Sequence, residues 1–195
     1  GLVPTRDWKR QTHGEAWFPG ETVIAGIGQG YLLATPLQLA VATAAIANHG
    51  KRVQPRLLAQ FENLETGEIV PGPEVRITAN TVVDSFLLDT VIQGMIAVVH
   101  GPRGTARASG RGAAYRMAGK TGTSQLVSIG QDEEYDADSV PERLRDHALY
   151  ITFAPVDRPR IALAVVVENA GSGSRVAAPI ARKILDYYFI ERLRR

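Results

Sequence analysis

One stretch of the sequence, residues 116–123, most constrains what this chain can become. It places a lysine, two threonines and a bare glycine at four consecutive positions, Lys120 to Thr123. The apolar residues before it are typical of a short buried strand, and side chains along a strand alternate between its two faces. We therefore expect Thr121 and Thr123 on one face and Lys120 on the other. Because Gly122 lets a second backbone lie close, the stretch predicts an edge to which an extended peptide with an anionic end adds as a strand.

Two phosphate-binding interpretations of the glycine-rich stretches fail on spacing. A P-loop requires a glycine five residues before its Gly-Lys pair, and Ala114 stands at that position. The run that begins at Gly26 resembles half of a dinucleotide fingerprint, but Tyr31 occupies the place of its third glycine. A lone Lys-Thr-Gly is also compatible with an ordinary core strand and a solvated lysine, so the rest of the chain must decide.

Composition places the chain among ordinary globular domains. Its 195 residues fit one domain, with an apolar fraction of 45% and a net charge of +2 that gives no basis for a nucleic acid partner. Without cysteine, disulfides and thiolate metal sites are excluded. No apolar run reaches the ~18 residues of a membrane span. We expect no metal and no cofactor, since the acidic run 132–138 matches no calcium loop and His49 has no second ligand at metal spacing.

Two helices are expected in the first half of the chain. The first has Thr35 as its N-cap and Pro36 at its first position, and the almost wholly apolar residues 37–47 predict a buried helix. The second begins with the capping-box pattern of residues 81–84 and ends at Gly101. Its buried stripe is expected to comprise Val83, Leu87, Val91 and Met95, widened by Leu88, Ile92 and Val99.

Strands are expected in two groups. Residues 52–76 predict a hairpin that turns at Thr66 and Gly67. Residues 148–153 and 161–167 are rich in β-formers, and together with the strand at Lys120 they predict three antiparallel strands.

The remaining segments complete an α+β pattern, in which an antiparallel sheet is flanked by helices. A final helix over residues 177–194 is expected to pack its apolar side on one sheet face. Residues 1–21, 101–112 and 124–146 are expected to be irregular connections. The apolar side of the final helix is expected to comprise Ile180, Ile184, Leu185 and Tyr188.

Several of these motifs, in this order and spacing, resemble the transpeptidase domain of class B penicillin-binding proteins, and more narrowly the elongation type. The similarity runs from residues 1–5 to the final helix. Residues 34–39, Ala-Thr-Pro-Leu-Gln-Leu, match a segment common to these proteins, and residues 119–123, Gly-Lys-Thr-Gly-Thr, match their third active-site motif. Residues 26–31 and 142–147 look like the elongation type rather than the division type.

The resemblance implies a fold and a reaction. The implied fold is the one shared by penicillin-binding transpeptidases and serine β-lactamases, in which a five-stranded antiparallel sheet lies between helices. In the reaction a serine, activated by the lysine of Ser-x-x-Lys, attacks the D-alanyl-D-alanine end of a peptidoglycan stem peptide. D-alanine leaves, and an amine of a neighbouring stem peptide accepts the acyl group. β-Lactam antibiotics acylate the same serine, so both ligands are implied partners.

The resemblance also implies roles for the residues of the motif. Lys120 places positive charge beside the substrate carboxylate, and the hydroxyls of Thr121 and Thr123 donate hydrogen bonds to it. The backbone N–H of Thr123 is implied as part of the oxyanion hole, so Lys120 and Thr123 are the candidate catalytic residues. The substrate-binding set is Lys120, Thr121, Gly122 and Thr123. Asp146 and His147 are interpreted as anchors of a loop.

The chain departs from the family pattern in one respect. It contains neither Ser-x-x-Lys nor Ser-x-Asn. We therefore expect residues 1–195 to be the C-terminal portion of one transpeptidase domain, inactive alone, whose N-terminal part covers an apolar face left exposed here. By resemblance, an upstream membrane helix anchors the whole protein at the periplasmic face of a bacterial inner membrane, where it meets the proteins of the elongation machinery.

Two other functions remain compatible with the sequence. A β-lactam sensor keeps the same pocket, so Lys-Thr-Gly does not distinguish a sensor from a transpeptidase. A non-catalytic module that docks to cell-wall assembly proteins would retain the fold without using Lys120. We rank the transpeptidase first, the sensor second and the structural module third.

Overall fold

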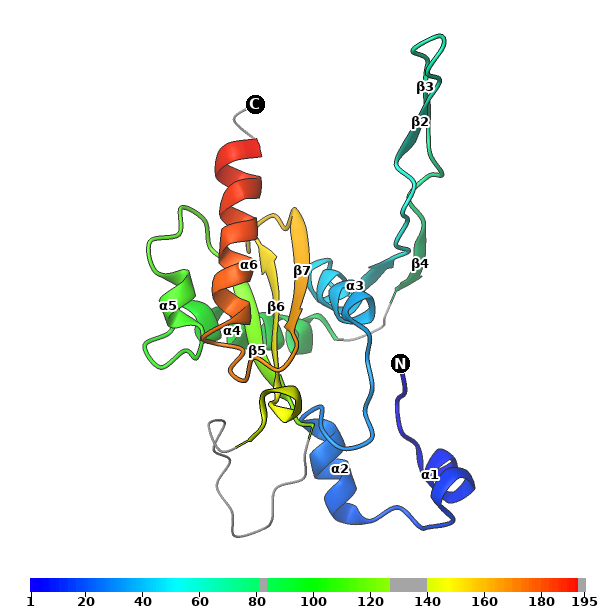
Figure 1. The fold of residues 1–195 in the computed structure, drawn as a ribbon, viewed down its shortest axis with the longest axis vertical. Helices are drawn as coiled ribbons and strands as arrows, with labels where there is room; N and C mark the ends of the chain where they lie inside the picture. Colours follow the sequence, from blue (N-terminus) through cyan, green and yellow to red (C-terminus); the bar gives the residue numbers. More distant parts are fainter. Residues whose placement is uncertain (81–83, 127–139, 193–195) are drawn as a thin grey trace.

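A computed structural model describes residues 1–80, 84–126 and 140–192 of the chain. At its centre lies a three-stranded antiparallel sheet in the order β5-β6-β7 (Figure 1). β5 spans Ala118–Ser124, β6 spans His147–Ala154 and β7 spans Ile161–Val167. Lys120 pairs with Ile151 and Thr121 with Tyr150, which fixes the register. The three predicted antiparallel strands are therefore confirmed, and β5 is an edge strand of this sheet in the described part of the chain.

Helices cover both faces of this sheet and give α+β architecture, as predicted. α3 (Pro36–Ala47) and α4 (Ser85–His100) pack on one face, and α6 (Ala177–Asp186) packs on the other (Figure 1). The first core cluster is formed by Ala47, Ile92, Met95, Ile96, Ala118 and Phe153. The second is formed by Val99, Ala106, Met117, Ala148, Tyr150, Ala154, Ala177, Ala178, Ala181 and Leu185.

The helix ends follow the sequence closely, but the buried sides do not. Thr35 caps α3 by accepting a hydrogen bond from the Gln38 N–H at 3.2 Å. The Gln38 side chain accepts a hydrogen bond from the Thr35 N–H, which completes a capping box. α4 begins at Ser85 with Asp84 as its N-cap, whereas residues 81–83 of the predicted capping box lie outside the described residues. α4 ends at Gly101 as predicted.

Three predicted buried faces need correction. α3 buries only Thr43 and Ala47, and Leu37 is 59% exposed, because only one side of this apolar helix meets the sheet. α4 buries part of the predicted set: Leu88, Ile92, Met95 and Val99 are buried together with Ile96, whereas Leu87 and Val91 are exposed. α6 approaches the sheet closely through small residues, so Ala177, Ala178, Ala181 and Leu185 are buried while Ile180 and Ile184 remain exposed.

The prediction that residues 1–21 are irregular is wrong. α1 spans Arg6–His13 and α2 spans Pro19–Gly26. Thr5 caps α1 by accepting from the Trp8 N–H at 3.1 Å, and Gly14 ends the helix at φ 70°. Both helices are short and begin directly at a capping residue or a proline, which is why breaker residues dominated the sequence pattern.

An ion-pair cluster joins α1 to α2. The Lys9 side chain is 1% exposed, and its Nζ lies 2.6 Å from Glu21 and 3.4 Å from Glu15. Burial opposes the charge of Lys9, but its hydrogen bonds to Glu21 and Glu15 outweigh burial and raise its pKa. The hydrogen bonds from Lys9 and from the Phe18 N–H lower the pKa of Glu21.

These directions predict a pH window for the α1–α2 segment. Because the pKa of Glu21 is lowered, Glu21 stabilises the segment at pH values above its ordinary pKa of 4.5. Because the pKa of Lys9 is raised, Lys9 stabilises the segment at pH values below its ordinary pKa of 10.5. We expect acidification below about pH 4.5 to loosen this segment before the sheet. The chain's two tryptophans, Trp8 and Trp17, both lie here, so their emission reports this segment alone. Lys9→Met should weaken the acid-dependent shift, and an equal shift in both proteins would contradict the assignment.

A long two-stranded arm projects from the helices (Figure 1). β1 (Lys51–Val53) pairs with β4 (Ile77–Asn80) at its base, and β2 (Gln60–Glu62) pairs with β3 (Ile69–Pro71) towards its tip. The predicted hairpin is confirmed, with its turn at Thr66 and Gly67 and Gly67 at φ 70°. The chain also contains a 3₁₀ helix, η1 (Glu142–Leu144), and a π-helix, η2 (Tyr187–Glu191). No helix in the described ranges is long and apolar enough to cross a bilayer.

Candidate functional site

β5 presents the predicted cation at the surface. Lys120 is exposed, and its Nζ donates a hydrogen bond to the carbonyl oxygen of Thr121 at 2.5 Å. Among the described residues no carboxylate lies within ion-pair distance of this ammonium group. Lys120 is therefore a cation available to an anionic ligand at the edge of the sheet.

The two threonines lie on the side of β5 opposite Lys120, because strand side chains alternate. Thr121 is half-buried, and its hydroxyl shares a hydrogen bond of 2.9 Å with the hydroxyl of Thr105. Thr123 is exposed near the end of the strand. The structure thus brings Lys120, Thr121 and Thr123 to one strand edge as the sequence predicted, and adds Thr105, which sequence reasoning missed.

Thr105 belongs to a segment that was predicted to be an irregular loop. This segment instead contains the short helix α5 (Arg107–Gly110), and Ala106 and Ser109 are buried. Arg182 of α6 holds it in place by donating from Nη1 to the carbonyls of Ser109 at 2.8 Å and Arg111 at 3.1 Å.

The same arginine is itself fixed by a carboxylate. Asp186 lies 2.8 Å from Arg182 Nε and accepts a hydrogen bond from the Tyr115 hydroxyl at 2.8 Å. Burial and the hydrogen bond to Asp186 raise the pKa of Tyr115, so the phenol stays a donor. A network from α6 therefore fixes the end of the segment that begins with Thr105.

Replacing Thr105 with valine tests this contact, because valine keeps the shape and removes the hydroxyl. A neutral hydrogen bond contributes about 0.5–1.5 kcal/mol. The resemblance implies that the full-length protein is acylated by penicillins, and we expect that acylation to slow by about 2- to 10-fold, since Thr121 loses the partner that orients its hydroxyl. Thr90→Val is a matched control, because Thr90 donates only to the carbonyl of Phe86 within α4. Equal rates for Thr105→Val and Thr90→Val would contradict the role.

Glycines around the lysine admit close neighbours. A Cβ at Gly119 would lie 2.2 Å from the hydroxyl of Tyr150, which is fully buried. Burial raises the pKa of Tyr150 to about 12, so it packs as a neutral phenol. The backbone that approaches Gly122 is that of Gly173, where a Cβ would lie 2.5 Å from the Gly122 carbonyl and 2.2 Å from that of Leu149. A Cβ at Gly122 itself would meet only the Leu149 Cβ, at 3.4 Å, so the docking of a peptide strand beside Gly122 stays a prediction.

The turn that carries Gly173 is anchored from β6. The Asn169 N–H donates to His147 Nδ1 at 3.0 Å, and the Gly171 N–H donates to the carbonyl of Asp146 at 2.8 Å. The Asn169 amide also donates to the carbonyls of Arg143 and Arg145. The interpretation of Asp146 and His147 as loop anchors is therefore confirmed.

A glutamine distant in sequence reaches the end of β5. Gln29 lies in the turn between α2 and α3, and its Nε2 donates to the carbonyl oxygen of Thr123 at 3.0 Å. The contact spans 94 residues, so no local pattern could have revealed it. Gly28 at φ 79° and Gly30 at φ 72° form this turn.

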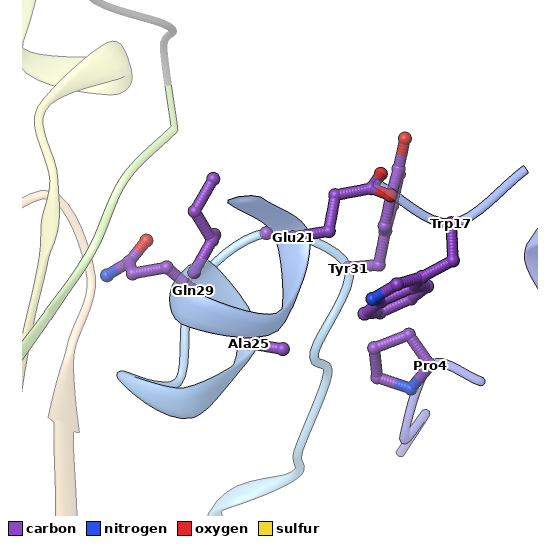
Figure 2. A pocket seen from close by; sticks show the side chains of 8 residues that line it. Pro4, Trp17, Glu21, Ala25, Gln29 and Tyr31 are labelled. Atoms are coloured by element: carbon purple, nitrogen blue, oxygen red, sulfur yellow. The ribbon is translucent and has the colours of Figure 1, made fainter. Parts of the chain in front are cut away.

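A small recess lies beside α2. The side chain of Gln29 points away from the Trp17 and Pro4 side chains that line it (Figure 2). Its volume is about 230 Å³, and it is lined by Pro4, Trp17, Glu21, Ile24, Ala25, Gln29, Gly30 and Tyr31. A larger groove of about 730 Å³ runs between α3 and the base of the arm. Neither is lined by Lys120, so the candidate site lies along the edge of β5 outside these two hollows.

The fold and this site define a class of protein. Residues 4–186 match the penicillin binding protein transpeptidase domain family, and the chain belongs to that family. It is 42% identical over 191 residues to the peptidoglycan D,D-transpeptidase MrdA of Salmonella typhimurium. That match covers 97% of this chain and 30% of the relative.

Solved structures give the same assignment of fold. The crystal structure of Pseudomonas aeruginosa PBP2 in complex with WCK 5153 has a TM-score of 0.79 and 43% identity, covering 98% of this chain and 38% of that one. The complex between PBP2 and MreC from Helicobacter pylori has a TM-score of 0.75 and 28% identity, covering 98% and 32%. The chain therefore spans about a third of the length of the relatives it matches.

Proposed function

We propose that this chain is the C-terminal portion of the transpeptidase domain of a peptidoglycan D,D-transpeptidase of the elongation type. The observation that carries the proposal is the exposed Lys120 on the edge strand β5, in a chain that belongs to the penicillin-binding transpeptidase family. The names of its relatives support the reaction, since they are peptidoglycan D,D-transpeptidases.

In the proposed function β5 holds the stem peptide. Lys120 attracts the terminal carboxylate, and the hydroxyls of Thr121 and Thr123 donate charge-assisted hydrogen bonds to it. The Thr123 N–H forms part of the oxyanion hole, where the loss of one donor typically costs about 100- to 1000-fold in rate. Gly122 keeps this part of the edge unobstructed. The serine that forms the acyl-enzyme comes from outside residues 1–195, which hold no Ser-x-x-Lys.

The exposed apolar side chains support a partial domain. Phe86, Leu87 and Val91 stand exposed on α4, and Val23 and Ile27 on or beside α2. Large exposed apolar surfaces are unusual in a soluble monomer. We propose that the N-terminal part of the same domain covers it.

We further propose the setting of the whole protein. An upstream helix anchors it at the periplasmic face of the inner membrane, where it meets stem peptides, β-lactams and proteins of the elongation machinery. The complex of PBP2 with MreC from Helicobacter pylori supports a partner of that kind.

Labelling with a fluorescent penicillin tests the function. The protein that carries this chain, with the upstream residues of its domain, should acquire one covalent label and cross-link stem peptides in the presence of an acceptor amine. Absence of labelling would contradict the proposal. Labelling without cross-linking would instead favour the β-lactam sensor.

A further inference from the structure

The outer edge of β5 is already occupied by side chains of this chain. Along a strand, backbone groups alternate between the two edges. The Ala118 carbonyl accepts a hydrogen bond from the Thr152 hydroxyl of β6 at 2.7 Å, so its edge faces β6. The carbonyls of Thr121 and Thr123, an odd number of residues away, therefore point to the opposite, outer edge. These two oxygens are the acceptors that an added strand would use.

Both acceptors have partners in the structure. Lys120 Nζ donates to the Thr121 carbonyl, and Gln29 Nε2 donates to the Thr123 carbonyl at 3.0 Å. An edge strand with unpaired backbone groups is a template for unwanted strand addition. Here two side chains satisfy the carbonyls of the edge, so a docking peptide must exchange its own groups for them.

The two partners respond to different parts of a ligand. A carboxylate draws Lys120 away from the Thr121 carbonyl, because an ammonium–carboxylate hydrogen bond is stronger than one to a neutral amide. Gln29 is uncharged, and a carboxylate exerts no comparable pull on it. Only a competing N–H donor, placed at the Thr123 carbonyl by strand geometry, replaces the Gln29 amide there.

The local backbone lets Gln29 yield without unfolding. Its main-chain N–H donates to the Ile24 carbonyl at 3.0 Å, which ties the turn to α2 independently of the side chain. Gln29 lies on the half-exposed surface of that turn, and its side chain extends away from Trp17 and Pro4 (Figure 2). A change of side-chain rotamer is therefore sufficient to release Thr123.

We propose that Gln29 is a specificity-determining residue that holds the Thr123 carbonyl until an amide N–H of the docking peptide replaces it. The inference rests on the proposed function of β5. It makes the site respond to two groups at once, a carboxylate that removes Lys120 and an N–H that removes Gln29. An anion without a correctly placed N–H binds Lys120 but does not displace Gln29 from the Thr123 carbonyl.

The test compares two β-lactams that differ only in the side-chain acylamino group next to the reactive ring, using competition with a fluorescent penicillin on the full-length protein. Gln29→Met removes the donor and keeps the length of the side chain. For the β-lactam with the N–H, acylation should accelerate by about 2- to 10-fold, the effect of one neutral hydrogen bond that no longer has to be broken. For the β-lactam without it, the rate should not rise.

The ligand dependence separates the role from a general structural effect. Damage to the fold would slow both β-lactams equally, and that outcome, like an equal or unchanged rate for both, would overturn the inference. Gln11→Met is the matched control, because Gln11 is exposed on α1 away from β5, and both ligands should react with it as with the wild type. If the wild-type protein takes no label, the proposed function fails; if it labels without the ligand-dependent gain, only the role of Gln29 fails.

Discussion

Lys120→Ala is expected to slow acylation of the full-length protein by a penicillin by about 10- to 150-fold. A hydrogen bond to a charged group contributes about 1.5–3 kcal/mol, and Lys120 is the cation that the described part of β5 offers to a carboxylate. Folding should be unaffected, because the side chain is exposed and donates its hydrogen bond to the carbonyl of the adjacent residue, Thr121. The measurement is the second-order rate constant for labelling.

Lys51→Ala is the control for this substitution, since Lys51 is an exposed lysine at the start of β1 in the arm. It should label at the wild-type rate. Lys120→Arg, which keeps the charge and changes its shape, should retain an intermediate rate. Labelling of Lys120→Ala at the wild-type rate would contradict the role of Lys120 and would favour the structural module.

Gly173→Ala is expected to destabilise the chain strongly, although it adds only one methyl group. The new Cβ would lie 2.2 Å from the Leu149 carbonyl and 2.5 Å from the Gly122 carbonyl. Both obstacles are backbone atoms of paired strands, so the turn must move and the site with it. Overpacking of this kind typically costs about 1–3 kcal/mol, and we expect the upper end. Urea unfolding followed by circular dichroism measures the change.

Gly94→Ala is a control that should change the free energy of unfolding in the opposite direction. Gly94 lies in the middle of α4, and a Cβ there meets nothing within 4 Å. Alanine in a helix interior is more favourable than glycine by about 0.8–1.0 kcal/mol, so residues 1–195 with this substitution should be stabilised when the proposed covering part is absent. Comparable stability of the two alanine variants would show that the turn at Gly173 yields easily, against the prediction.

The sequence was most informative where local chemistry decides structure. Thr35 and Pro36 specify the start of α3 by themselves, and the alternation around Lys120 specifies that the two threonines share one face of the strand. The same reasoning missed α1 and α2, because helices of this length carry little periodicity, and their signals are single capping residues such as Thr5. The acidic run 132–138 lies outside the described residues.

Faces and long-range contacts were harder to predict for a physical reason. α4 is apolar on more than one side, so its pattern fits two stripes one residue apart, and only packing on the sheet selects Leu88 over Leu87. The lysine motif predicted the core of the site. Its supports, Thr105, Gln29 and Gly173, come from segments distant along the chain, and nothing local in the sequence marks them as neighbours of β5.

The projecting arm leaves α3 and returns towards α4 through the paired strands β1 and β4, so its entry and exit lie side by side. The described residues beyond that base contribute nothing to the two core clusters. The length and composition of the arm therefore do not affect the geometry of β5. The arm can change in length or sequence without disturbing the packing that positions Lys120.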